Sequence, residues 1–123
     1  MTDAGAVATR YIELVGAHDL RPLEELISDS VIATTVAGTF DKTEWVAALA
    51  RLLPVLERNE IRHVVVDGNT ACVIYDFVTD TDAGAVPCAE WITVDADGRM
   101  TDIRLLFEKT NWATVAAAIQ ARS

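Results

Sequence analysis

The stretch that decides the fold is 61-IRHVVVDGNTACVIYDFVTD-80. It contains two runs rich in β-branched residues, Ile61–Asp67 and Thr70–Asp80. The hairpin turn signal Asp67-Gly68-Asn69 joins them. Two further runs follow, Val86–Asp95 and Met100–Glu108, with a second Asp-Gly turn signal between them. The sequence therefore predicts four consecutive strands connected as a meander.

The residues before this stretch have helical periodicity. A first helix is expected from about Thr2, a second after Asp19, and a third after Asp41 and Glu44, which have the spacing of a capping box. Their apolar faces consist of Val7, Tyr11, Leu14, Val15 and His18 in the first, Leu23, Leu26 and Ile27 in the second, and Trp45, Leu49, Leu52, Leu53 and Leu56 in the third. A strand at Val31–Val36 is predicted between the second and third helices.

Helices followed by a meander of strands are typical of the α+β class. We expect one domain over residues 1–123, in which a curved, mostly antiparallel sheet wraps around the N-terminal helices. A closing helix is expected after Asn111. We find no internal repeat, linker or low-complexity tract in the sequence.

The composition limits the classes of partner. The formal net charge is −9, which argues against nucleic acid and anionic membranes as partners because both attract basic surfaces. The segment Met1–Gly5 lacks a basic region followed by an apolar run, so no signal peptide is expected. Cys72 and Cys88 are expected to be free thiols, and the cytoplasm is the expected location.

Several chemistries lack their motifs. There is no glycine-rich phosphate loop, no dinucleotide fingerprint and no nucleophile elbow. His18 and His63 stand alone, without the spacing of metal ligands. We therefore expect no cofactor and no metal, and what remains is acid–base chemistry by carboxylates and tyrosines, or no chemistry at all.

Two residues are candidates for that chemistry. Tyr11 lies on the apolar face of its helix, where it is either a core tyrosine with one buried partner or a hydrogen-bond donor in a cavity. Glu90 interrupts an inward-facing set of small and apolar residues at period two, so its carboxyl group is expected to be buried with a raised pKa. The alternative is a rim position or an ion pair with Arg104.

The orientation of the strand from Ala71 to Val78 decides whether Asp76 or Tyr75 points toward the pocket. Asp76 would be a second acid or base if it pointed inward. Val73, Tyr75 and Phe77 form the better inward set, which leaves Asp76 outside. Tyr75 then becomes a second hydroxyl group near Glu90.

Three segments resemble a known family. Thr9–Val15, with the sequence TRYIELV, is similar to the first-helix motif of bacterial ketosteroid isomerases. Asp97–Met100 and Phe107–Asn111 are similar to the final hairpin and tail of that family, and the looser pattern resembles the SnoaL-like polyketide cyclases. The resemblance implies the cone-like, cystatin-like roll of the nuclear transport factor 2-like superfamily and a homodimer formed through the sheet. Trp91 is expected at or near that contact.

The resemblance also implies roles for single residues. Tyr11 falls on the tyrosine that donates a hydrogen bond to the steroid oxyanion. Glu90 falls on the protonated carboxylic acid beside it when the last strands are aligned through Gly98, whereas an alignment through Pro87–Ala89 shifts this match. The catalytic aspartate of the family falls on Thr35, which cannot act as a base near neutral pH. The resemblance therefore supports the fold and half of an oxyanion site, but not authentic steroid isomerisation.

The expected function is a cofactor-free pocket for a small hydrophobic organic ligand. The reaction would be an isomerisation, dehydration, cyclisation or hydrolysis, with Glu90 as acid or base and Tyr11 as hydrogen-bond donor. The alternative is an inert ligand-binding or dimerisation module on the same fold. The residues expected to line the pocket are Thr35, Trp45, Tyr75, Phe77, Ile92, Ile103, Leu105 and Phe107.

Overall fold

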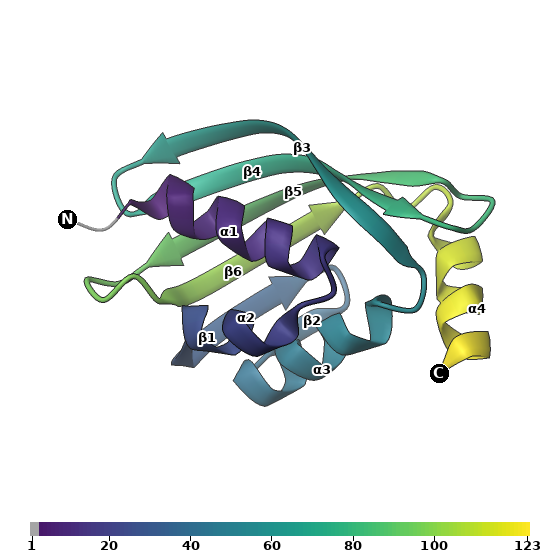
Figure 1. Ribbon diagram of the computed structural model, residues 1–123, viewed down its shortest axis with the longest axis horizontal. Coiled ribbons are helices and arrows are strands. Elements are labelled where there is room, and N and C mark those ends of the chain that lie inside the picture. The colour runs from purple at the N-terminus through teal and green to yellow at the C-terminus, as the bar shows by residue number, and fades with distance from the viewer. Residues whose placement is uncertain (1–2) are drawn as a thin grey trace.

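The computed structural model describes residues 3–123. The elements are α1 (Ala4–Gly16), α2 (Leu20–Leu26), β1 (Ile27–Thr35), β2 (Gly38–Phe40), α3 (Lys42–Leu52), β3 (Leu56–Asp67), β4 (Thr70–Thr79), β5 (Ala85–Val94), β6 (Met100–Phe107) and α4 (Trp112–Arg122). The strands form one sheet in the order β2-β1-β6-β5-β4-β3, in which only β1 and β6 pair in parallel. The sheet curves around α1, and α4 stands at one end of it (Figure 1). The α+β class with a mostly antiparallel curved sheet is confirmed.

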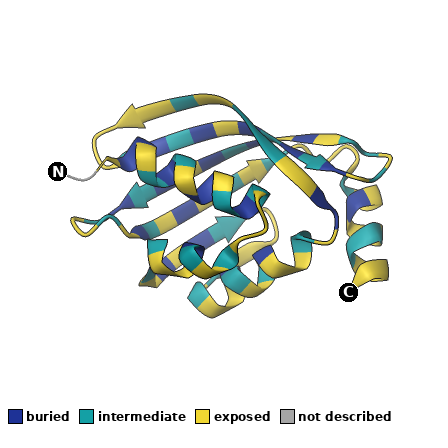
Figure 2. Cartoon of the chain, viewed as in Figure 1, coloured by how far each residue is buried: buried dark blue, intermediate teal, exposed yellow. Residues whose placement is uncertain are grey.

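Strict alternation along β4 and β5 gives the sheet an inner and an outer face, visible as alternating colours in Figure 2. Val73 is paired with Glu90 and Tyr75 with Cys88, so Tyr75 and Glu90 are diagonal neighbours on the inner face. Asp76 lies on the other face, where its carboxylate bonds to the guanidinium group of Arg62 at 2.6 Å. The predicted orientation of β4 is therefore confirmed.

The helix starts agree with the predicted caps to different degrees. Asp41 and Glu44 form the full reciprocal capping box of α3. Asp19 and Asn111 occupy the N-cap positions of α2 and α4, but neither side chain bonds to the helix. The predicted start at Thr2 lies outside the described residues, and α1 begins at Ala4 after an N-cap aspartate.

His18 was expected on the apolar face of the first helix, and this was wrong. Its φ angle is +62°, the left-handed conformation that ends α1 in a Schellman motif. The two bonds of that motif run from the His18 N–H to the Val15 carbonyl at 3.0 Å and from the Asp19 N–H to the Leu14 carbonyl at 2.9 Å. The imidazole Nε2 lies 2.6 Å from the Leu56 carbonyl oxygen, so this ring links the helix end to β3.

The third helix is shorter and the following strand longer than predicted. The α3 helix ends at Leu52, before Pro54, and β3 begins at Leu56 rather than Ile61. Irregularities in the β3–β4 register, at Leu56/Arg58 and Ile61/His63, interrupt the period of two that would have revealed the start of this strand. Leu56 is buried as expected, but from a strand and not from a helix.

Candidate functional site

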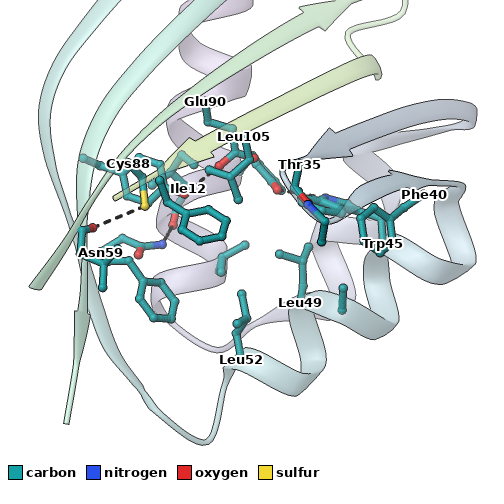
Figure 3. Close-up of a pocket in the computed structure, with 18 of the residues that line it drawn as sticks. Ile12, Thr35, Phe40, Trp45, Leu49, Leu52, Asn59, Cys88, Glu90 and Leu105 are labelled. Carbon is teal, nitrogen blue, oxygen red and sulfur yellow. Dashed lines mark hydrogen bonds between the residues drawn. The ribbon is translucent and has the colours of Figure 1, made fainter. Parts of the chain in front are cut away.

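A cavity of about 170 Å³ lies between the inner face of the sheet and the helices α1 and α3 (Figure 3). Most of its lining side chains are apolar, and α4 contributes Trp112 at its first position. Among the predicted site residues, those that line it are Tyr11, Thr35, Trp45, Tyr75, Phe77, Glu90, Leu105 and Phe107. The fold thus brings both candidate acid–base residues to one cavity.

Glu90 is the buried carboxyl group of this cavity, with an exposed fraction of 1%. The Tyr75 hydroxyl donates a hydrogen bond of 2.7 Å to its Oε1. Its Oε2 is buried and has no hydrogen-bond partner among residues 3–123. Arg104 lies on the outer face of β6 opposite Trp91, so the ion pair considered as an alternative does not form.

Burial determines the ionisation of Glu90. Removal from water raises its pKa from the ordinary value of 4.5 to about 7, and the hydroxyl groups of Tyr75 and Tyr11 oppose part of this rise. A carboxyl group with a pKa close to the ambient pH exists in both protonation states, so it can donate or accept a proton.

Tyr11 is also buried, at the α1 side of the cavity. Its oxygen accepts a hydrogen bond of 3.1 Å from Trp45 Nε1, which leaves the phenolic proton available for donation. Burial, and secondarily the nearby Glu90 charge, raises the pKa of Tyr11 well above its usual value. The Tyr11 hydroxyl group lies close enough to Glu90 to lower its pKa, but the two groups do not form a hydrogen bond of normal geometry.

Two further polar groups of the lining have little acid–base capacity. Thr35 Oγ1 accepts a hydrogen bond of 3.0 Å from the Ala37 N–H, and an aliphatic hydroxyl group cannot act as a base near neutral pH. Burial raises the pKa of the Cys88 thiol to about 12, which keeps it protonated and weakly nucleophilic.

The described part of the chain contains no cluster of three His, Cys, Asp or Glu residues that could hold a metal ion. No helix within residues 3–123 is long and apolar enough to cross a membrane.

Ile92 and Ile103 were expected to line the pocket, but they do not. They face each other across β5 and β6 and have no exposed surface. The cavity occupies only part of the inner face, and the hydrophobic core fills the section around these two residues. Strand alternation predicts correctly that they point inward, but it does not predict where along a strand a cavity ends.

Sequence reasoning missed several lining residues, of which Asn59 matters most. Its Nδ2 donates a hydrogen bond of 3.0 Å to the Ile12 carbonyl oxygen of α1. It was overlooked because the strand was expected to start at Ile61. Phe40 and Trp112 were also missed, and each has a ring against a predicted lining residue: Trp45 at 5.6 Å and Phe107 at 4.5 Å between centroids.

Solved structures share this fold at low sequence identity. A protein from Kribbella flavida DSM 17836 is 24% identical with a TM-score of 0.85, covering 98% of this chain and 99% of that one. A steroid delta-isomerase from Pseudomonas aeruginosa is 16% identical with a TM-score of 0.77, covering 97% and 90%. An epoxide hydrolase of the LEH-like type from M. tuberculosis is 13% identical with a TM-score of 0.71, covering 96% and 90%. These likenesses establish the fold alone.

No curated protein matches the sequence. The family model of the SnoaL-like domain matches residues 8–103, which include most of α1, the first five strands and the start of β6. This range contains Tyr11, Asn59, Tyr75 and Glu90. The chain therefore belongs to the SnoaL-like domain family, within the nuclear transport factor 2-like superfamily.

Proposed function

We propose that this protein binds a small, largely apolar organic molecule through one accepting oxygen, and that Glu90 is its acid–base group. The observation that carries this proposal is the Glu90 carboxyl group, which is buried in the wall of an apolar cavity with one oxygen bonded to Tyr75 and the other without a partner among the described residues. Groups of this kind occur preferentially at functional sites.

The hydrogen bond from Tyr75 supports one position for the proton of the neutral acid. Because Oε1 accepts from Tyr75, we propose that the carboxylic proton lies on Oε2. Below a pH of about 7, Oε2 then donates to a ligand oxygen such as a carbonyl. Above it, Oε2 is a carboxylate oxygen that removes a proton, while the Tyr11 hydroxyl group can donate to the ligand oxygen.

The reaction class follows from these two groups. Acid–base chemistry without a cofactor covers isomerisation, dehydration, cyclisation and hydrolysis. Structures titled steroid delta-isomerase and epoxide hydrolase share the fold, which supports this range. We do not propose steroid isomerisation, because by resemblance Thr35 falls on the position of the family's base and cannot act as a base near neutral pH.

The size of the cavity narrows the ligand class. A volume of about 170 Å³ is close to that of an apolar cavity of ~150 Å³ that binds benzene. The ligand is therefore about one six-membered ring with small substituents.

The free thiols Cys72 and Cys88 fit a reducing compartment, and we propose the cytoplasm as the location.

A matched pair of ligands tests the oxygen contact. Acetophenone has a carbonyl oxygen where α-methylstyrene has a methylene group, and the two have nearly the same shape. We expect acetophenone to bind about tenfold more tightly at pH 6, as one buried hydrogen bond allows. The Glu90→Leu variant should lose this preference and keep its affinity for α-methylstyrene. Equal affinity of the wild-type protein for both ligands would contradict the proposal.

A second candidate function is an inert ligand-binding module, favoured by the absence of a base at Thr35. Exchange of the methyl protons of acetophenone in D₂O distinguishes it from an enzyme. In an enzyme, Glu90 removes a methyl proton, the C–H electron pair forms the enolate, and Tyr11 donates to its oxygen. We expect NMR to show exchange with the wild-type protein and only background exchange with Glu90→Gln. Binding without exchange would favour the inert module.

A further inference from the structure

We propose that Asn59 is a second ligand contact, which accepts a hydrogen bond from a hydroxyl or N–H group of the ligand at a position separate from the oxygen that meets Glu90. This inference rests on the proposed function, because it concerns the same cavity. It specifies the ligand class as a small ring compound with an accepting oxygen and, separately, a hydrogen-bond donor. A hydroxylated aromatic ketone has this pattern.

The orientation of the Asn59 amide is fixed by its partner. The Ile12 carbonyl oxygen lies 3.0 Å from one amide atom of Asn59, and a carbonyl can only accept. That amide atom is therefore the nitrogen, and the other is Oδ1. Oδ1 is buried and has no hydrogen-bond partner among residues 3–123.

The surrounding backbone holds Asn59 in this place. Gly16, at the end of α1, approaches β3 so closely that a Cβ atom there would lie 2.9 Å from the Asn59 backbone nitrogen. The amide cannot rotate to satisfy Oδ1 without giving up the bond to Ile12. The unpaired acceptor is therefore a fixed property of the junction between α1 and β3.

Asn59 Oδ1 and Glu90 Oε2 are the two buried side-chain oxygen or nitrogen atoms without a partner in the described part of the chain, and both residues line the same cavity. They come from different strands, β3 and β5, and Figure 3 shows both residues among the side chains around the cavity. A buried polar atom without a partner costs free energy, which a ligand group of the right polarity recovers.

The two oxygens require different ligand groups. Neutral Glu90 donates from Oε2, whereas Asn59 Oδ1 can only accept. Neighbouring side chains cover both oxygens, so the ligand reaches them after small shifts of the lining. A compound that carries an acceptor and, at a separate position, a donor satisfies both.

A purely structural role for Asn59, as a link between α1 and β3, makes a different prediction. Loss of that link lowers the free energy of unfolding and weakens all ligands alike. If Asn59 instead accepts a hydrogen bond from the ligand, its removal changes the relative affinities of ligands with and without a donor group. The test therefore compares ligands within each protein variant.

The experiment measures dissociation constants by calorimetry at pH 6 for acetophenone, its 3′- and 4′-hydroxy derivatives, and the matching methoxy derivatives. At least one hydroxy derivative is expected to bind the wild-type protein about fivefold more tightly than acetophenone, and its methoxy counterpart should show no gain. Asn59→Leu and Asn59→Ala should abolish the gain, so that within each variant the hydroxy derivative and acetophenone bind with the same affinity.

Each result separates this inference from the proposed function. A preference for acetophenone over α-methylstyrene without any gain from a hydroxyl group overturns the role of Asn59 and leaves that of Glu90 intact. A hydroxyl gain that survives in both Asn59 variants also overturns it. If neither acetophenone nor its derivatives bind, the proposed function fails and this inference fails with it.

Discussion

The Tyr75 hydroxyl group lies 2.7 Å from Glu90 Oε1 and donates to a carboxyl group that has almost no solvent exposure. The antiparallel register of β4 and β5 produces this contact, because it places the two residues diagonally on the inner face. The bond fixes Oε1 as an acceptor and leaves Oε2 for a ligand. It therefore connects the sheet register directly to the proposed chemistry.

The stability of the protein should decrease as the pH rises, because the pKa of Glu90 is higher in the folded protein than in the unfolded chain. Its pKa is about 7 in the folded protein and near 4.5 when unfolded, so between these values the folded state holds more protons. The free energy of unfolding therefore falls as pH rises from about 4.5 to about 7, by about 3 kcal/mol from this group.

Urea unfolding of the wild-type protein and of Glu90→Gln at pH 5 and pH 8 measures this contribution. The other carboxyl groups titrate equally in both proteins, so their difference isolates Glu90. From pH 5 to pH 8, we expect the free energy of unfolding of Glu90→Gln to rise by about 3 kcal/mol relative to that of the wild-type protein. A constant difference would show that Glu90 titrates normally.

Tyr11→Phe should destabilise the protein through Trp45. The variant removes the only acceptor that the described residues offer to the buried Trp45 Nε1. A buried donor without a partner costs about 1–3 kcal/mol. In a Trp45→Phe background the same change should cost clearly less, and a double-mutant cycle by chemical denaturation measures the coupling. Additive effects would mean that the bond contributes nothing.

Thr35→Val should leave the ligand site intact. The methyl groups of valine preserve the apolar lining, and the Thr35 hydroxyl oxygen already accepts a bond from the Ala37 N–H, so we do not expect it to bind the ligand. We expect a loss of about 0.5–1.5 kcal/mol in stability and an acetophenone affinity within about twofold of the wild-type value. A large loss of affinity with unchanged stability would instead make this hydroxyl a ligand contact.

We also predict a homodimer formed through the outer face of the sheet. Trp91, Leu106 and Ile74 are exposed there at 39%, 47% and 42%, and such apolar surfaces commonly mark an interface. Sedimentation should show a dimer at micromolar concentration, and Trp91→Glu should shift it to monomers. The control is Ala47→Glu on an exposed helical position, which should remain dimeric. A monomeric wild-type protein would refute the prediction.

Periodicity together with the family resemblance predicted the α+β class with a curved, mostly antiparallel sheet, and periodicity predicted the inward direction of the acid–base residues. Glu90 stands out because it is a carboxylate among inward apolar residues, and Tyr75 follows from the orientation of its strand. Asn59 could not be found in this way, because register irregularities obscure the start of β3. Its role depends on a contact with Ile12, far away in the chain, which no local pattern encodes.

The extent of the cavity was equally hidden from the sequence. Ile92 and Glu90 have the same orientation on β5, yet only Glu90 reaches the cavity. The difference arises from how far the core side chains fill the curved sheet, which is a property of three-dimensional packing. Sequence periodicity therefore identifies inward residues but does not separate a pocket wall from a core.

The most direct test of the central claim is a ¹³C NMR titration of the Glu90 carboxyl carbon, assigned by its loss in Glu90→Gln, with and without acetophenone. We predict an apparent pKa of about 7 in the free protein. Acetophenone should raise this pKa further, because a carbonyl oxygen binds the protonated acid in preference to the carboxylate. A carboxyl group that titrates near 4.5, or a pKa that acetophenone leaves unchanged, would contradict the claim that neutral Glu90 holds the ligand oxygen.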